Sequence, residues 1–407
     1  MYEKKLMEIA DTYGTPTYAF FEETLTKQVG LIRELLPKGT QICFAMKANP
    51  FLAGALADMV DKLEVCSFGE YEICIREGID AGKLVVSGVS KTFEQMKEIM
   101  SYSQGRGIYT IESKQQYEVL KKCAKEFQVR FKVLPRLSSG NQFGMDEENL
   151  MQVLSQIYED DLMDVAGLHY YGGTQKKTEK IEKELKLLED TGKKITEKYG
   201  INDLELEYGP GLKASYFEND SEGDKESADE RKQLTGLANM LDNIQGFGRI
   251  TIELGRFLTA GCGYYLTRIM DIKHTGKAGY IIVDGGIHQI NYYGQLMGMK
   301  KPYMKLIGEK ECRTIEQNDK SGQVGYSVCG SLCTANDVLV RDIKPDCYKI
   351  GDVISFERCG AYSVTEGMAL FLSREFPQVL YVKADGTVDR LRHKMEINIF
   401  NSKMEEI

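Results

Sequence analysis

One lysine of the chain stands where a reactive amine could be formed. Lys47 follows the apolar run ICFAM at residues 42–46 and precedes Pro50 by three residues. A lysine whose stem is enclosed by apolar walls loses hydration, which lowers its pKa toward the neutral amine required for a Schiff base. A lysine can also end a strand with its ammonium extended into water, and the local stretch by itself favours this second interpretation.

Two later stretches combine residue types that bind anions. YGPGL at residues 208–212 has two glycines and a proline without an N–H donor, which lets backbone N–H groups approach a phosphate. A strand-to-helix turn is the commoner use of such a stretch. In ELGRF, Glu253 can bind a protonated ring nitrogen, Gly255 can add a backbone donor, and Arg256 can clamp an anion through two hydrogen bonds. A surface Glu–Arg pair explains this second stretch equally well.

Aromatic and imidazole side chains form a third group of candidates. His169 and Tyr171, in GLHYYGGTQ at residues 167–175, lie on one face of an extended segment because side chains alternate along a strand. A buried structural role is the ordinary alternative for His169. Tyr362, in CGAYS, could reach a phosphate or complete a turn.

Ten cysteines are scattered singly, without the C-x-x-C pairs of zinc sites or the density of a disulfide scaffold. This distribution predicts a reducing cytoplasm. CGSLCTANDVL at residues 329–339 contains Cys333 and Asp337. The thiol could serve as an acid or base, or remain a buried cysteine, and without histidines nearby we expect no metal.

Elements that position these side chains can be recognised along the first two thirds of the chain. Apolar or β-branched runs alternate with helical patterns, at residues 41–46, 62–67, 83–88, 107–112, 129–137, 165–171, 204–209 and 249–254. Eight β-then-α units predict an α/β fold, a (β/α)8 TIM barrel, with catalytic groups at the C-terminal ends of its strands. The candidates at this mouth are Lys47, Ser67, Ser87, Arg136, His169, Tyr171, Gly209 to Gly211, Glu253 and Arg256.

After residue 255 the pattern changes to glycine-punctuated β runs, at residues 263–273, 278–286, 324–330, 337–344 and 352–357. A chain of 407 residues exceeds the roughly 250–300 at which single cores stop growing, so two domains are expected. We predict a barrel over residues 25–260 and a C-terminal β-sandwich or β-barrel domain over 1–24 and 261–407. The polar, acidic segment 214–235 reads as a loop that is either solvated or a lid over the site.

Charge and hydropathy exclude several partners. The 52 Lys and Arg against 61 Asp and Glu give a formal charge of -9 without a long basic run, which argues against nucleic acid and anionic membrane surfaces. No stretch approaches the ~20 apolar residues of a membrane span, and the charged N-terminal stretch lacks the pattern of a signal peptide. Small molecules or proteins are the expected partners.

Together and in this order, the motifs resemble those of the fold-type III pyridoxal-phosphate decarboxylases. This group holds the diaminopimelate and ornithine decarboxylases and is related to alanine racemase. The resemblance extends from about residue 10 to about residue 385 and rests on FAMKAN, EVCSFGE, GLHYYGGTQ, YGPGL, ELGR, CTAND and GAYS. It implies an alanine racemase-like fold with pyridoxal 5'-phosphate as the cofactor.

The resemblance also implies roles for individual residues. Lys47 forms the Schiff base with the cofactor, and Glu253 pairs with the ring nitrogen. Cys333 comes from the other subunit of a head-to-tail homodimer with shared active sites and protonates the carbanion after carbon dioxide leaves. The remaining cofactor contacts are the phosphate group Gly209, Gly211, Gly255 and Tyr362, together with Arg136, His169, Tyr171 and Arg256.

Two departures from the family pattern bear on the substrate. Tyr171 stands where the family commonly has a second histidine, and an aromatic ring can still stack there. Thr334 follows the site cysteine, where the diaminopimelate and ornithine enzymes often have an acid that meets the substrate's distal amine. With LPRLSSGNQFGMDEE at 134–148, these departures resemble the subgroup of antibiotic- and siderophore-pathway decarboxylases. One of these acts on a glutamyl group attached to an acyl-carrier protein.

We therefore predict decarboxylation of an amino acid, free or linked to a carrier protein. Arg256, Thr334 and Asp337 are the expected substrate contacts. Asp337 or the partner chain could supply a distal charge, so diaminopimelate decarboxylation to L-lysine stays as an alternative. The further alternatives are an amino-acid racemase on the same scaffold and a non-catalytic pyridoxal-phosphate-binding protein.

Overall fold

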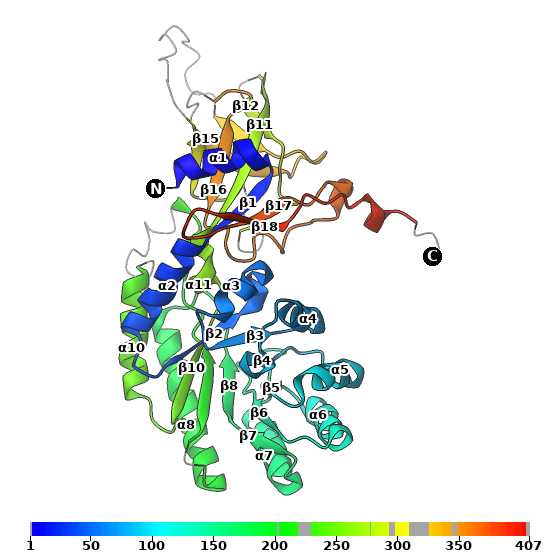
Figure 1. Ribbon diagram of the computed structural model, residues 1–407. Coiled ribbons are helices and arrows are strands. Elements are labelled where there is room, and N and C mark those ends of the chain that lie inside the picture. The colour runs from blue at the N-terminus through cyan, green and yellow to red at the C-terminus, as the bar shows by residue number, and fades with distance from the viewer. Residues whose placement is uncertain are drawn as a thin grey trace. The chain divides into compact units, whose positions relative to one another are not determined.

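A computed structural model of the chain describes residues 2–201, 203–218, 229–276, 278–292, 298–308, 325–343 and 348–403. The chain divides into two compact units (Figure 1). The barrel unit consists of Thr26–Ala214 and Glu226–Leu258, and the β-rich unit of Met1–Leu25, Ser215–Lys225 and Thr259–Ile407. Each unit therefore combines segments that are far apart in the sequence.

A parallel sheet forms the centre of the barrel unit, in the order β7-β6-β5-β4-β3-β2-β10-β9-β8. Its strands are β2 Gln41–Ala45, β3 Lys62–Val65, β4 Leu84–Val86, β5 Ile108–Ile111, β6 Phe131–Pro135, β7 Met163–Val165, β8 Gly167–Tyr171, β9 Glu205–Gly209 and β10 Arg249–Leu254. Every predicted barrel strand is present. β7 and β8 together correspond to the single predicted strand at 165–171, because only Ala166 separates them.

Closure of the barrel depends on one bridge beyond the regular strands. Arg136 and His169 form a parallel bridge, and the backbone N–H of Leu137 donates to the carbonyl of His169 at 3.0 Å. This joins the end of β6 to β8, the last strand of the sheet order. The predicted (β/α)8 barrel is thus confirmed, and its C-terminal strand ends surround one mouth.

Helices follow the strands around the barrel. They are α2 Glu22–Leu35, α3 Ala53–Ala57, α4 Phe68–Arg76, α5 Phe93–Ser103, α6 Lys114–Phe127, α7 Glu147–Asp160, α8 Thr178–Tyr199, α10 Glu230–Asn243 and α11 Arg256–Thr259. Several begin at a side-chain cap, which satisfies a backbone N–H of the first turn and lets the helix start shortly after a strand. These caps are Ser67, Thr92, Ser113, Asp146 and Asp229.

The acidic segment 214–235 is only partly a loop. Residues 219–228 lie outside the described residues. The prediction is wrong for residues 230–235, which form the first turns of α10. Asp229 caps this helix by accepting hydrogen bonds from the N–H groups of Arg231 and Lys232, so the acidic residues of this stretch support a helix start.

Charged side chains are buried inside the barrel, which the sequence did not lead us to expect. Lys62 forms an ion pair with Glu205 and also contacts Glu207, with 3.4 Å between Nζ and Oε2. Its ammonium further donates to Oγ1 of Thr251 at 3.1 Å. Burial raises the pKa of Glu207 to about 7, and the Lys62 charge opposes this only in part. Buried charges of this kind persist where partners compensate their desolvation.

A mixed sheet forms the β-rich unit, in the order β15-β14-β12-β11-β1-β17-β18, with β16 pairing β11 and β13. Its strands are β1 Thr17–Phe21, β11 Gly263–Thr275, β12 Ala278–Val283, β13 Met304–Ile307, β14 Tyr326–Cys329, β15 Val338–Ile343, β16 Val353–Glu357, β17 Gln378–Val382 and β18 Val388–Arg392. The five predicted runs all contain strands. Helix α1, Glu3–Tyr13, packs against this sheet through Leu6, Ile9 and Ala10.

The N-terminal segment enters the β-rich sheet as a central strand. β1 pairs with β11 antiparallel and with β17 in parallel, with Thr17 opposite Gln378. A hydrogen bond of 2.8 Å from Nε2 of Gln378 to Oγ1 of Thr17 supports this register. A β-rich unit separate from the barrel unit confirms the predicted fold class.

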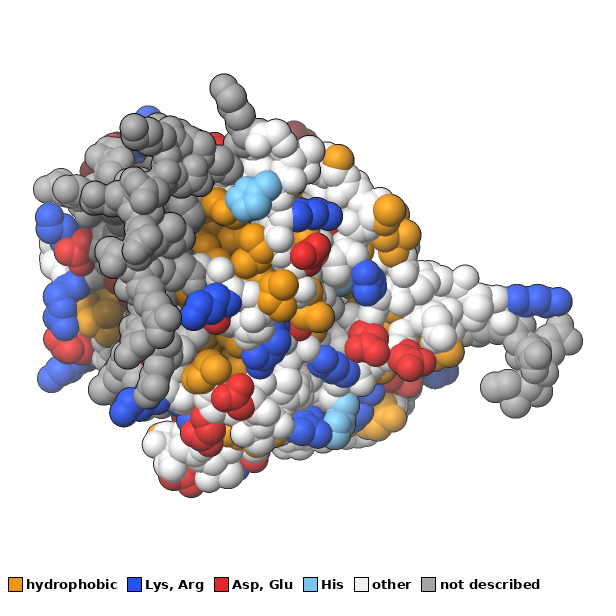
Figure 2. All heavy atoms as spheres, turned by 90° about the horizontal axis from the view of Figure 1, so that it is seen from above, with side chains coloured by type: hydrophobic (Ala, Val, Ile, Leu, Met, Phe, Trp, Pro, Cys, Tyr) orange, Lys and Arg blue, Asp and Glu red, His pale blue; other side chains and the backbone are white. Residues whose placement is uncertain are grey.

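The surface carries charged side chains of both signs (Figure 2). On the face in Figure 2, acidic and basic side chains of the described residues are interspersed, and neither sign forms a dominant patch. Among the described helices, none combines the length and the apolar composition of a membrane span.

Candidate active site

Lys47 lies in a cluster of buried polar side chains at the barrel mouth. It belongs to a short 3-10 helix, Met46–Ala48, that directly follows β2. Its Nζ is 3.0 Å from Oε2 of Glu64 and 3.7 Å from Oε1 of Glu253. Sγ of Cys66 lies at 3.7 Å, and the ring centre of Tyr171 at 5.4 Å. The amine is therefore held by protein groups from neighbouring strands.

Glu253 links Lys47 to His169. Nε2 of His169 lies 3.1 Å from Oε2 of Glu253, and the histidine is 1% exposed. Burial raises the pKa of Glu64, but the Lys47 charge, a hydrogen bond with Glu253 and the nearby His169 together hold that pKa well below its usual range. Glu64 is therefore ionised, and the cluster balances the lysine charge with carboxylates.

The same three groups could in principle bind a metal ion. One ligand atom from each of Glu64, His169 and Glu253 lies within 4.8 Å of the others. The ammonium of Lys47 already supplies a positive charge 3.0 Å from Glu64. A cation added to this cluster would be repelled by that ammonium, so the geometry favours an amine site over a metal site.

Two glycines shape the loop at the end of β9. Gly211 has φ +61°, and a Cβ there would lie 2.2 Å from the carbonyl oxygen of Gly173. A Cβ at Gly209 would lie 2.4 Å from the ring of Tyr171. Side chains are excluded at both positions, and the loop can present its backbone to a ligand.

Tyr171 occupies the space between this loop and Lys47. Its ring packs against Gly209 and faces the Lys47 ammonium. Burial raises the pKa of Tyr171, while the charges of Lys47 and Arg256 act in the opposite direction. Arg256 and Gly255 directly follow β10, beside the Glu253 strand end. The ring is therefore placed where it can stack on a planar ligand bound at Lys47.

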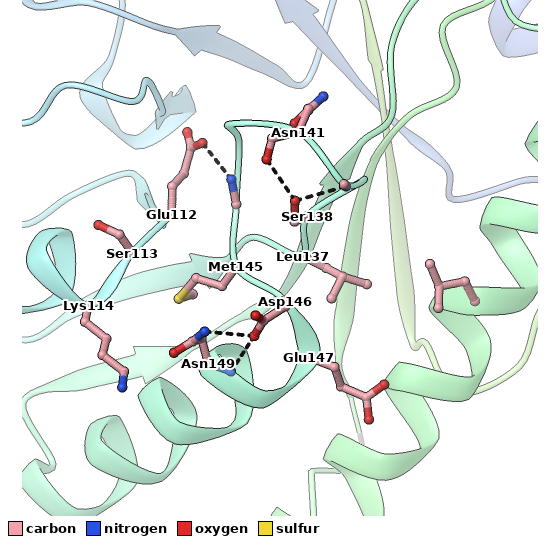
Figure 3. A pocket seen from close by; sticks show the side chains of 13 residues that line it. Glu112, Ser113, Lys114, Leu137, Ser138, Asn141, Met145, Asp146, Glu147 and Asn149 are labelled. Atoms are coloured by element: carbon pink, nitrogen blue, oxygen red, sulfur yellow. Dashed lines mark hydrogen bonds between the residues drawn. The ribbon is translucent and has the colours of Figure 1, made fainter.

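Arg136 pairs with Glu112, an acid that no sequence motif marks as a site residue. Its Nη1 lies 3.1 Å from Oε2 of Glu112, and both side chains are almost fully buried. The N–H of Gly144 donates to the same oxygen at 3.3 Å (Figure 3). Oε1 of Glu112 and Nε of Arg136 are buried without a partner in the described part of the chain. The position of Glu112, at the end of the predicted strand 107–112, was the available signal.

A cavity of about 660 Å³ opens next to Glu112 (Figure 3). The loop after β6 and the first residues of α6 and α7 line it, including Ser138, Asn141, Met145 and Asp146. The cavity lies at the ends of β5 and β6, and its described lining includes none of Lys47, Glu64 and Glu253.

Lys91 is a second buried lysine among the barrel loops. Its ammonium donates to the carbonyl of Gly88 at 2.7 Å, to Oγ1 of Thr110 at 3.1 Å and to Oε1 of Gln116 at 3.2 Å. Burial lowers its pKa to about 8. All three donors have acceptors, so Lys91 ties the loop after β4 to its neighbours.

The four other predicted residues belong to the β-rich unit. Cys333 is exposed and Thr334 is half-buried. Asp337 is 2% exposed, and its two carboxylate oxygens accept the N–H groups of Ile287 at 2.9 Å and Leu332 at 2.7 Å. Tyr362 has φ +64°, an uncommon conformation outside glycine.

The barrel residues fit the cofactor that the motifs implied. Pyridoxal phosphate requires an amine for its aldehyde, an acid for its ring nitrogen and donors for its phosphate. Lys47, Glu253 and the loop 209–211 come from β2, β10 and β9, which are adjacent in the sheet. Nδ1 of His169 is buried without a partner among the described residues, which leaves a polar atom for a bound ligand.

Comparisons with known proteins agree with this site. The family model for the pyridoxal-binding domain of pyridoxal-dependent decarboxylases matches residues 22–260. Over 418 residues the chain is 26% identical to L-glutamyl-(BtrI acyl-carrier protein) decarboxylase of Niallia circulans, covering 96% of this chain and 94% of that protein. Over 391 residues it is 26% identical to diaminopimelate decarboxylase of Methanocaldococcus jannaschii, covering 88% and 84%.

A solved structure shows the same fold. The crystal structure of diaminopimelate decarboxylase from M. jannaschii matches with a TM-score of 0.81 at 23% identity, covering 96% of this chain and 92% of that chain. The predicted family resemblance, including its nearness to the subgroup of antibiotic- and siderophore-pathway decarboxylases, is confirmed. The chain therefore belongs to the pyridoxal-dependent decarboxylases, with pyridoxal 5'-phosphate as its cofactor.

Proposed function

We propose that this enzyme removes a carboxylate from an amino acid, with Lys47 as the amine that bonds to the cofactor aldehyde. The observation that carries the proposal is the position of Nζ, 3.0 Å from Glu64 and 3.7 Å from Glu253. A lysine that merely reached into water would not sit between two buried carboxylates. Lys47 and Glu253, the proposed partner of the cofactor ring nitrogen, thus lie in one cluster.

The surrounding side chains have separable tasks. When bound, pyridoxal phosphate delocalises the electron pair left by the departing carboxylate. Glu253 keeps the ring nitrogen protonated, and His169 fixes the orientation of Glu253 through their 3.1 Å contact. Tyr171 stacks on the ring, while Gly209, Gly211, Gly255 and Tyr362 hold the phosphate. Arg136 contacts a cofactor oxygen, and Arg256 clamps an anionic group of the cofactor or substrate.

We assign proton donation to the partner subunit's Cys333 in a homodimer with shared active sites. The exposure of Cys333 in its own unit supports this assignment. The loop that carries it is braced by Asp337 and by a 2.6 Å hydrogen bond from Nη2 of Arg374 to the carbonyl of Ser331. Because both oxygens of Asp337 are engaged, we give it a positioning role in place of substrate contact.

Residues 25–260 then supply the cofactor barrel, and residues 1–24 with 261–407 the domain that carries the proton donor. The cysteines that the structure describes are free thiols, which supports the cytoplasmic location we propose.

The substrate we propose has a distal end without a positive charge. Thr334, next to Cys333, offers a hydroxyl and no carboxylate to a distal amine. An amide or thioester end, as in a carrier-bound glutamyl group, does not need that acid, and a relative of this activity is 26% identical over nearly the whole chain. Diaminopimelate decarboxylation is the second candidate, supported by the similarly related enzyme of M. jannaschii.

Carbon dioxide release from a substrate panel tests the proposal. The panel contains diaminopimelate, ornithine, lysine, free glutamate and carrier-bound glutamate. We expect release from carrier-bound glutamate above the others, whereas preference for diaminopimelate would establish the second candidate. Lys47→Ala should lose the visible absorbance of the lysine-bound cofactor, and the exposed Lys38→Ala should keep it. A colourless wild-type protein after loading would overturn the role of Lys47.

A further inference from the structure

A buried ion pair lies beside the glycine loop that ends β9. Nζ of Lys176 is 2.5 Å from Oε2 of Glu184, and their side chains are 1% and 6% exposed. The hydroxyl of Tyr208, the residue before Gly209, donates to the same carboxylate oxygen at 2.7 Å. Burying two charges is costly unless they are paired and hydrogen-bonded, so this arrangement calls for a reason.

Lys176 binds the loop through both its backbone and its side chain. Its backbone N–H donates to the carbonyl of Gly211 at 2.9 Å, and its ammonium donates to the carbonyl of Gly209 at 3.0 Å. Its Cε would lie 2.7 Å from a Cβ at Gly211, so the side chain runs directly along the loop. One residue thereby fixes both glycine carbonyls.

Lys176 differs from its neighbour Gln175 because its contact with the loop is made by a charged group. Gln175 pairs with the backbone of Ala214 through hydrogen bonds of 2.7 and 2.8 Å, using only its neutral amide. Burial lowers the pKa of Lys176, and the hydrogen bond and charge of Glu184 oppose this. The third N–H of the ammonium has no acceptor among the described residues, and the Tyr208 ring centre lies 5.2 Å from Nζ. The ammonium charge is thus paired with Glu184, and its hydrogen bond to Gly209 holds the loop.

Fixing the Gly211 carbonyl sets the direction of the Leu212 N–H in the same peptide, whereas the Gly209 carbonyl precedes Pro210, which has no N–H, so the ammonium bond there holds the start of the loop in place. A loop held in one conformation binds a phosphate without the entropic cost of ordering it. Because Glu184 neutralises the Lys176 ammonium, the effect of Lys176 is to hold the loop in position. This acts on the phosphate end of the cofactor and leaves the ring contacts of Glu253 and Tyr171 unchanged.

We propose that Lys176, held by Glu184 and Tyr208, is a positioning residue that sets the affinity of the barrel for the cofactor phosphate. This inference rests on the proposed function, since it takes the loop 209–211 as the phosphate site. It assigns a role to a lysine outside the recognised motif residues. It also predicts that the role is specific to phosphate.

Paired binding measurements test it. Pyridoxal 5'-phosphate and pyridoxal share the ring and the aldehyde and differ in the phosphate. We would titrate each into the full-length, cofactor-free protein and measure both dissociation constants. Lys176→Met should weaken phosphate-ester binding by about 10- to 100-fold and pyridoxal binding by less than about threefold, because preorganisation is lost only at the loop.

Lys180→Met is the matched control. Lys180 lies in the first turn of α8, donates to the carbonyl of Gly172 at 2.9 Å and lies 4.0 Å from Glu184, but is 56% exposed. It should change neither constant by more than about threefold, since exposed charges contribute little. Equal losses for both ligands in Lys176→Met, or no loss, would overturn the proposal.

Two milder variants keep the test informative if Lys176→Met fails to fold. Tyr208→Phe removes only the hydroxyl that holds Glu184, and it should weaken the phosphate ester selectively by a smaller factor. Lys176→Gln keeps a donor for Gly209 without the charge, and its loss should lie between those of wild type and Lys176→Met. If these variants change both dissociation constants equally, the role of Lys176 is also refuted. A wild-type protein that binds neither ligand would instead refute the proposed function.

Discussion

Nζ of Lys47 lies 3.0 Å from Oε2 of Glu64, a carboxylate that is 2% exposed on the neighbouring strand β3. Burial opposes ionisation of Glu64, yet the Lys47 charge and the hydrogen bond with Glu253 hold its pKa well below the usual range. The pair therefore stabilises the cofactor-free barrel as an ion pair. It also gives the lysine a fixed place before the cofactor binds.

Glu64→Gln should lower stability in a pH-dependent way. The folded pKa of Glu64 lies below its ordinary value of 4.5, so its contribution is fully present above that pH and is lost as the pH falls through the folded pKa. We expect the substitution to cost about 1–3 kcal/mol at neutral pH, with the cost shrinking toward acid. Urea unfolding of the cofactor-free protein, with the exposed Glu72→Gln as control, measures this. A cost that is constant with pH would contradict the assignment.

Glu207 should change the pH dependence of stability in the direction opposite to Glu64. Burial raises its folded pKa to about 7, so stability falls as the pH rises from about 4.5 to about 7 and stays low above. Glu207→Gln should therefore be more stable than wild type at pH 8 by about 1–3 kcal/mol, and this gain should shrink near pH 4. The same unfolding series detects it. A variant that is less stable than wild type at pH 8 would show that Lys62 requires the Glu207 charge.

Some elements of the fold can be recognised within a short stretch of the sequence, whereas others depend on residues that are far apart. Barrel strands were predictable because each is a short apolar run followed by a helical pattern, and Lys47 could be placed at the end of the first. β1 and β17 were not predicted, because their pairing joins Thr17 to Gln378 across almost the whole chain. No short window contains both partners of such a pair.

Buried polar partners were missed for a related reason. Glu64 and Glu112 stand in or after strands, where a single acid looks like a solvated edge residue. Their partners, Lys47 and Arg136, lie on neighbouring strands. Lys176 follows a recognised motif by one residue, but its burial depends on Glu184, which lies on the following helix α8. Only the fold brings these pairs together.

Mixed dimers test whether Cys333 acts in its own subunit or in the other. Cys333→Ala should keep the cofactor absorbance and lose about 100- to 10,000-fold in turnover, as expected for removal of a proton donor. Lys47→Ala should be inactive for a different reason. If the subunits exchange, a mixture of the two variants should recover about a quarter of wild-type activity, because each mixed dimer rebuilds one complete site.

Each variant alone is the baseline, and Cys329→Ala is the thiol control, since Cys329 lies in β14 and donates to the carbonyl of Ser327. Recovery shows a shared site. Mixed dimers that form, as seen with two affinity tags, but recover no activity would show that Cys333 does not act across the dimer.

Gly211→Ala tests the shape of the phosphate loop separately from the contacts that Lys176 makes to it. Gly211 and Gly200 both have positive φ, +61° and +69°, so alanine costs about 1–2 kcal/mol of backbone strain at either position. Only at Gly211 would the new Cβ also meet a carbonyl, that of Gly173 at 2.2 Å, whereas nothing lies within 4 Å at Gly200. We expect Gly211→Ala to weaken cofactor binding by about tenfold or more and Gly200→Ala to leave it unchanged, because only the first displaces the loop. Thermal unfolding of both variants without cofactor reports the shared strain, and cofactor titration reports the difference. Equal cofactor affinities for the two would mean that the loop tolerates displacement and does not define the phosphate site.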